Sequence, residues 1–103
     1  CISVQRILVH ESIYDELREA LRNWIIEKVP VGDPTRRETV VGPMINAAAR
    51  DKILGWIREA LDAGARALTP VEPQGPSTLA PVLLENVRPG CAALDEEAFA
   101  PLA

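Results

Sequence analysis

The sequence predicts an α/β fold in which two amphipathic helices lie beside short strands. Apolar residues recur every three or four positions over 13–28 and again over 46–64, which is the spacing of a helix with one buried face. Short runs of β-branched and aliphatic residues at 7–9, 66–69 and 79–85 are typical of strands. The order β-α-α-β-β predicts a mixed α/β layer.

The first helix has recognisable signals at both ends. Ser12 and Asp15 have the spacing of a capping box, with Ser12 as the N-cap and Asp15 at the third helical position. The helix should end near Lys28, because Pro30 lacks a backbone donor and restricts the residue before it. Trp24 falls on the apolar face, so we expect it to be buried against the sheet.

The second helix has equally clear limits. Asn46 is expected to cap its first turn, and Gly64 stands where a left-handed residue closes a helix. Trp56 and Ile57 belong to the inner face, and we expect Trp56 to be buried as well. A loop rich in proline and glycine follows over 70–78 and leads into the last predicted strand.

Composition and charge narrow the class of protein. A chain of 103 residues makes at most one domain, and 11 basic against 15 acidic residues give a net charge of -4. The absence of a basic block argues against a nucleic-acid surface. No apolar run has membrane-spanning length, and we expect no signal peptide. Cys1 and Cys91 form neither a metal-binding spacing nor a disulfide framework, so we expect a cytoplasmic protein without a metal.

The two ends of the sequence suggest a piece of a longer polypeptide. The chain begins at Cys1 without Met and stops shortly after Phe99, where a new apolar segment starts. Natural domains seldom end inside an element. We therefore expect residues 1–103 to be one fragment of a larger domain.

Three side chains are candidates for chemistry, each with a plain alternative. Cys1 can act as a thiolate nucleophile, or it can be a packed thiol at a chain end. Glu97 can accept hydrogen bonds from ribose hydroxyls while Phe99 packs on a flat ring, or the acidic pair Glu96-Glu97 can be a solvated step. His10 is the one histidine in the sequence, and we interpret it as a residue at the end of a strand.

Motifs along the whole chain resemble the NAD(P)-dependent aldehyde dehydrogenase superfamily. Residues 96–101, Glu-Glu-Ala-Phe-Ala-Pro, are similar to the family's Glu-Glu-x-Phe-Gly-Pro, with Ala100 in place of the glycine. Residues 1–15 resemble the segment that carries the nucleophile. Further resemblances, in the family's order, lie at 31–34 (Val-Gly-Asp-Pro), 41–45, 63–69 and 79–84.

The resemblance implies a fold and a mechanism. The chain would be a partial catalytic domain with a mostly parallel sheet flanked by the two helices, and the parent enzyme a homo-oligomer acting on a small aldehyde. Cys1 would attack the aldehyde, hydride would pass to NAD or NADP, and the resulting thioester would be hydrolysed. Glu97 would hold the nicotinamide ribose and Phe99 would lie beside the nicotinamide. The nucleotide domain, the general-base glutamate and the oxyanion asparagine lie upstream in the family, so we expect the isolated chain to be inactive.

The same resemblance predicts where these segments meet. Cys1 and Glu97 should lie on one edge of the sheet, separated by about the span of a nicotinamide ribose. Residues 5–9 should therefore lie close to residues 97–99.

Two hypotheses from other classes of protein remain open. In an N-terminal-nucleophile hydrolase, Cys1 would attack with its own α-amine as the base. In a non-catalytic interaction or folding unit, Cys1 would have no chemical role.

Overall fold

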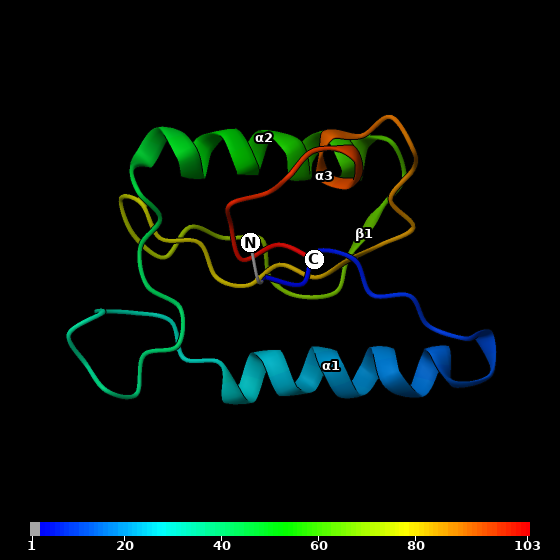
Figure 1. Cartoon of the computed structure of the whole chain (residues 1–103), viewed down its shortest axis with the longest axis horizontal. Coiled ribbons are helices and arrows are strands. Elements are labelled where there is room, and N and C mark those ends of the chain that lie inside the picture. The colour runs from blue at the N-terminus through cyan, green and yellow to red at the C-terminus, as the bar shows by residue number, and fades with distance from the viewer. Residues whose placement is uncertain (1–2) are drawn as a thin grey trace.

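The chain folds into three layers, with extended segments between two helices. The computed structural model describes residues 3–103. Helix α2 (Ala47–Asp62) covers one side of the extended segments, and α1 (Tyr14–Lys28) lies on the other (Figure 1). A short 3₁₀ turn, η1 (Glu11–Ile13), leads into α1, and the four-residue helix α3 (Ala92–Asp95) packs against α2. Among the residues described, no helix is long and apolar enough to cross a bilayer.

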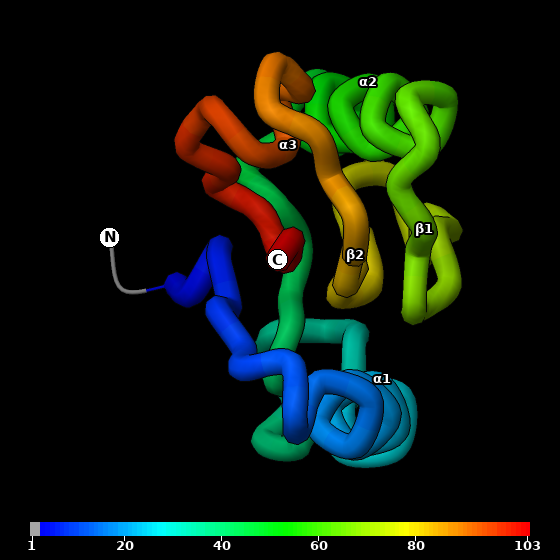
Figure 2. The backbone as a smooth tube through the Cα atoms, turned by 90° about the vertical axis from the view of Figure 1, so that its right-hand side faces the viewer, coloured from blue at the N-terminus to red at the C-terminus, as the bar shows by residue number. Residues whose placement is uncertain are grey.

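The regular sheet is small and antiparallel. Strand β1 (Arg66–Ala67) pairs with β2 (Leu84–Glu85), so that Arg66 lies opposite Glu85. Figure 2 shows both strands between the two helices. The predicted mostly parallel sheet is not found in residues 3–103. The connection over 68–83 contains no crossover helix, which parallel neighbours require, and the chain returns in the opposite direction.

The end of the chain adds a parallel neighbour beside β2, and a second parallel bridge joins Val31 to Val41. Val82 forms a parallel bridge with Leu102. The Val82 amide donates to the Pro101 carbonyl at 2.8 Å, and the Ala103 amide donates to the Val82 carbonyl at 3.0 Å. The last residues thus lie along the 82–84 segment, and the sheet is mixed in direction.

The strand predicted over 7–9 is also absent. This stretch has no ladder partner among the residues described, and the Leu8 side chain is 97% exposed. A β-branched and aliphatic composition favours a strand, but a strand forms only where a second backbone offers hydrogen bonds.

Capping chemistry agrees with the prediction for α2 but not for α1. Asn46 Oδ1 accepts the Ala49 amide at 2.8 Å, and Gly64 follows the helix with φ of 102°. Before α1, His10 caps the 3₁₀ turn by accepting the Ser12 amide on Nδ1 at 3.2 Å. The capping box predicted at Ser12 is therefore wrong, although α1 ends at Lys28 as expected.

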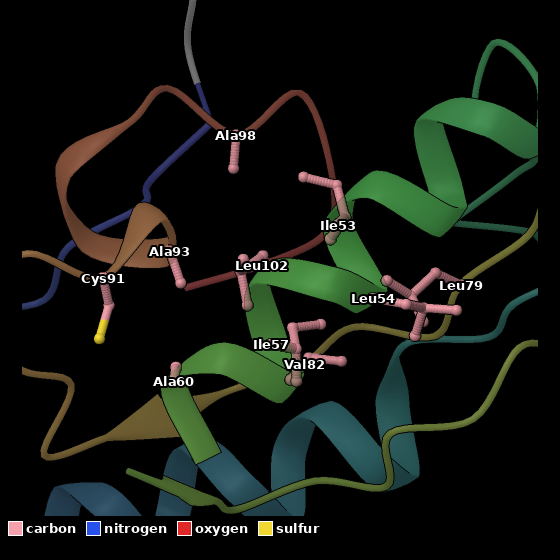
Figure 3. Packing of buried hydrophobic residues seen from close by; sticks show 10 residues of the cluster. All are labelled: Ile53, Leu54, Ile57, Ala60, Leu79, Val82, Cys91, Ala93, Ala98 and Leu102. Atoms are coloured by element: carbon pink, nitrogen blue, oxygen red, sulfur yellow. The ribbon is translucent and has the colours of Figure 1, made fainter. Parts of the chain in front are cut away.

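The core forms where the apolar face of α2 meets the 79–83 segment and the end of the chain. Figure 3 shows the α2 side chains directed toward Leu79, Val82 and Leu102. Ile57 and Leu79 are fully buried, each with 0% exposure. The buried cluster comprises Ile53, Leu54, Ile57, Ala60, Leu79, Val82, Cys91, Ala93, Ala98 and Leu102.

Helix α1 buries none of its residues. Trp24 is 58% exposed, so its predicted burial is wrong. Trp56, on α2, is only half-buried. The Lys52 ammonium lies 4.6 Å from the centre of the Trp56 ring. Helical periodicity identifies an apolar face, but burial needs a layer opposite that face. The described residues leave an open pocket between α1 and the sheet instead of a packed interface.

Polar contacts hold α1 against the sheet. The Tyr14 hydroxyl donates to Glu85 Oε2 at 2.8 Å, and Arg22 Nε donates to the Leu68 carbonyl at 3.0 Å. The buried Glu85 carboxylate also pairs with Arg66 and lies 3.9 Å from Arg18. The hydrogen bond to Glu85 raises the pKa of Tyr14 above 10.0, and burial and the charge of Glu85 act in the same direction.

We predict opposite outcomes for two truncations of large apolar residues. Ile57→Ala should lower the free energy of unfolding by about 2–5 kcal/mol, because it opens a cavity in the core. Trp24→Ala should cost less than about 1 kcal/mol, because the ring is mainly in solvent. Urea unfolding of both variants measures the difference, and equal losses would contradict the placement of the core.

We predict that the Tyr14–Glu85 contact makes stability fall at high pH. A raised pKa in the folded state favours the protonated phenol, so its contribution is complete below pH 10 and is lost as pH rises through the raised pKa. Tyr14→Phe should therefore be less stable than the parent at pH 8, with the gap closing above pH 10. Urea unfolding across this range tests the prediction, and a gap that does not change with pH would contradict it.

Candidate functional site

The candidate site is built on the extended segment that follows α3. Glu96 ends that helix with φ −101° and ψ 157°, and its amide donates to the Ala92 carbonyl at 3.0 Å. Side chains alternate between the two sides of an extended chain. Ala98 points into the core and is buried, whereas Glu97 and Phe99 are exposed, Phe99 by 73%. The buried alanine thus presents the two predicted cofactor-binding residues outward.

The N-terminal segment is fastened to this loop by hydrogen bonds. Gln5 Oε1 accepts the Ala98 amide at 3.0 Å, and Gln5 Nε2 donates to the Glu96 carbonyl at 2.6 Å. The Arg6 guanidinium donates to the Leu94 carbonyl. Residues 93 positions apart in sequence therefore meet at this point. The expected proximity of the 5–9 segment to the 97–99 segment is confirmed at Gln5, although the 5–9 segment is not a strand.

A pocket lies where the two segments meet. It is lined by Ser3, Gln5, Glu97, Ala98, Phe99 and Ala100. Cys1, the predicted nucleophile, lies outside the described residues and belongs to the chain two positions before Ser3. The structure thus brings Glu97 and Phe99 together with the segment that follows Cys1.

The side chains of this pocket suit a nucleotide better than a metal ion. Glu97 offers an exposed carboxylate that can accept hydrogen bonds from a diol, and Phe99 offers an exposed ring face for a flat heterocycle. Within residues 3–103, no three His, Cys, Asp or Glu side chains form a metal-binding group. Cys91, the cysteine that the structure describes, is buried in the core and takes no part in this pocket.

Sequence reasoning assigned no role to Gln5 or Arg6. Their signal is weak, because a polar pair before an aliphatic run is ordinary at the start of a strand. The partners of both side chains are backbone groups of residues 93–98, and no local pattern indicates contacts over that separation. Only the three-dimensional arrangement reveals them.

The family follows from a comparison with known proteins. A family model described as "Aldehyde dehydrogenase family" matches residues 1–103. The chain belongs to the aldehyde dehydrogenase family. It is 36% identical over 104 residues to benzaldehyde dehydrogenase YfmT of Bacillus subtilis (strain 168), a match that covers 99% of this chain and 21% of that protein. It is also 36% identical to the sulfoacetaldehyde dehydrogenase of Neptuniibacter caesariensis, covering 99% of this chain and 22% of that protein.

Solved aldehyde dehydrogenases share the fold. Aldehyde dehydrogenase 21 from Physcomitrella patens, in complex with the reaction product succinate, superimposes with a TM-score of 0.92 and 33% identity. That match covers 100% of this chain and 21% of the other. A second match is the NADP-dependent glyceraldehyde-3-phosphate dehydrogenase of Bacillus halodurans C-125, complexed with NADP, with a TM-score of 0.88 and 30% identity. It covers 99% of this chain and 21% of the other. The chain therefore spans about a fifth of the length of the relatives it matches.

Proposed function

We propose that this chain supplies the nucleophile and part of the nicotinamide-nucleotide site of an aldehyde dehydrogenase. The enzyme would oxidise an aldehyde to a carboxylic acid, with NAD or NADP as the hydride acceptor. One observation carries the proposal: the Gln5 side chain joins the segment after Cys1 to the loop that presents Glu97 and Phe99. Membership of the family and a relative solved with NADP also support it.

Cys1 has the role of nucleophile in this proposal. Its thiolate adds to the aldehyde carbon, forming a C–S bond and a thiohemiacetal. A nicotinamide nucleotide, when bound, would supply the acceptor for the hydride that leaves this carbon, and a thioester would remain on Cys1. Water then displaces the thiolate, which releases the carboxylic acid and restores the nucleophile. Hydride transfer demands that the acceptor ring be held close to the adduct.

Glu97 and Phe99 orient the nucleotide. The carboxylate of Glu97 would accept hydrogen bonds from the ribose hydroxyls, and the ring of Phe99 would pack against the nicotinamide. Both side chains are already exposed on one side of the loop, because Ala98 between them is buried. Ala100 replaces the glycine of the family motif, and its methyl group narrows the backbone conformations open to the loop.

The isolated chain should not catalyse the reaction by itself. It spans about a fifth of its relatives, and the nucleotide domain and general base that the resemblance implies are not among its motifs. A cytoplasmic location and a homo-oligomeric parent enzyme also belong to this proposal.

We predict that the chain can replace its counterpart in an active relative. A chimera of Bacillus subtilis benzaldehyde dehydrogenase, with this chain in place of its matching 104-residue region, should oxidise benzaldehyde with NAD or NADP. Cys1→Ser should reduce its activity to background, because the hydroxyl is a far weaker nucleophile. Glu97→Gln should raise the KM for nucleotide by roughly 10- to 100-fold, the loss expected for hydrogen bonds to a charged group.

The second cysteine gives the matched control. Cys91→Ala should retain activity, because Cys91 is buried in the core away from the pocket. A folded chimera in which Cys1→Ser remains active would overturn the proposal. Nucleotide-independent ester hydrolysis by the 103-residue chain, abolished by Cys1→Ser, would instead favour the N-terminal-nucleophile hydrolase.

A further inference from the structure

We propose that Gln5 is a positioning residue that sets the direction of the Glu97 carboxylate. This inference rests on the proposed function, because it concerns how the nucleotide-binding loop is held. Gln5 would contact neither the aldehyde nor the nucleotide. It acts through the backbone on both sides of Glu97.

The two hydrogen bonds of Gln5 enclose Glu97. In an extended chain, the carbonyl before a residue and the amide after it point to the same side. The Gln5 carboxamide meets both groups, because Nε2 donates to the Glu96 carbonyl at 2.6 Å and Oε1 accepts the Ala98 amide at 3.0 Å. The side chain thus pairs with Glu97 as a neighbouring strand would, and it fixes the backbone from which the carboxylate projects.

Only a carboxamide of this length makes both bonds. Its planar group carries a donor, the NH₂, on one side and an acceptor, the oxygen, on the other. The orientation of the carboxamide is determined, because its nitrogen cannot accept a hydrogen bond from the Ala98 amide. A glutamate at position 5 would keep the acceptor but turn a carboxylate oxygen toward the Glu96 carbonyl. An asparagine would be one methylene too short to reach the same pair of groups.

Further contacts tie the same segment to α3. A helix leaves its last carbonyl groups without partners inside the helix. Gln5 Nε2 lies 3.5 Å from the Ala93 carbonyl, and the Arg6 guanidinium donates to the Leu94 carbonyl. The segment therefore binds both the end of α3 and the loop beyond it, so the two cannot move independently.

The arrangement links the two halves of the site. Gln5 stands four positions after Cys1 in the sequence, so the side chain that holds Glu97 belongs to the same segment as the proposed nucleophile. A reacting group displaced by about 1 Å can lose roughly a hundredfold in rate. The position of the nucleotide should therefore depend on Gln5, while binding of the aldehyde should depend on it less.

The experiment compares Gln5→Glu and Gln5→Leu with a matched control, Gln74→Glu. Gln74 is an exposed glutamine on the 70–78 loop and does not line the pocket. In the chimera, each Gln5 variant should raise the KM for nucleotide about tenfold. Gln5→Leu loses both hydrogen bonds, and Gln5→Glu loses one and places a carboxylate oxygen against the Glu96 carbonyl. The KM for benzaldehyde should stay within about twofold, and Gln74→Glu should change neither value.

Hydrogen exchange of the 103-residue chain gives a second readout that needs no activity. The Ala98 amide should exchange about tenfold faster in Gln5→Leu, which removes its acceptor, while the amide of Ile57, in the core helix, should keep its protection. Unchanged exchange at Ala98 would overturn the inference. So would equal acceleration at Ala98 and Ile57, because the effect would then be loss of the whole fold.

The inference and the proposed function fail in different ways. If Cys1→Ser abolishes activity and Gln5→Glu leaves the nucleotide KM unchanged, the proposed function stands and the role of Gln5 is wrong. If both KM values rise together in the Gln5 variants, Gln5 is merely structural. If Cys1→Ser has full activity, the proposed function is wrong whatever Gln5 does.

Discussion

The burial of one face of α2 is the constraint on which the rest of this structure depends. Ile57 on the helix and Leu79 opposite it are fully buried, and Leu102 at the end of the chain joins the same cluster. Three segments distant in sequence thereby share one apolar surface. Ala98 is part of that surface too, so the core itself determines how the loop around Glu97 approaches the site.

Polar contacts fasten the remaining parts to this core. Glu85 keeps a buried carboxylate only because Tyr14, Arg18 and Arg66 surround it, since an isolated buried charge would be strongly unfavourable. Helix α1 buries no residue and depends on these contacts. The stability of the chain is therefore uneven, with the α2 side the more resistant to opening and the α1 side the less. The N-terminal segment is held in the same polar manner, through Gln5.

Local signals in the sequence predicted local structure well. Asn46 and Gly64 mark the limits of α2, because capping depends on chemistry within a few residues. One local prediction failed, because His10 caps a 3₁₀ turn where a capping box at Ser12 was expected. The other errors involve partners elsewhere in the chain. Within residues 3–103, Trp24 is exposed because no layer covers its side of α1, and residues 7–9 are not a strand because no backbone there pairs with them.

The candidate site was predicted to a different degree for each of its parts. Glu97 and Phe99 are candidates from a motif resemblance and their roles stay a prediction, whereas the family itself is confirmed over residues 1–103. The meeting of the first and last segments was an implication of that resemblance, since composition and periodicity carry no information on contacts 93 residues apart. The hydrogen bonds of Gln5 were beyond prediction, because a carboxamide side chain has no sequence signal for the backbone groups it will meet.

A double-mutant cycle between Gln5 and Glu97 tests most directly whether the two ends of the chain form one nucleotide site. The measurement is the KM for nucleotide in the chimera carrying Gln5→Glu, Glu97→Gln or both. If Gln5 acts through Glu97, the double variant should be within about twofold of Glu97→Gln alone, because the carboxylate it positions is already lost. If the two effects multiply in full, the residues act independently and the account of a single site is wrong.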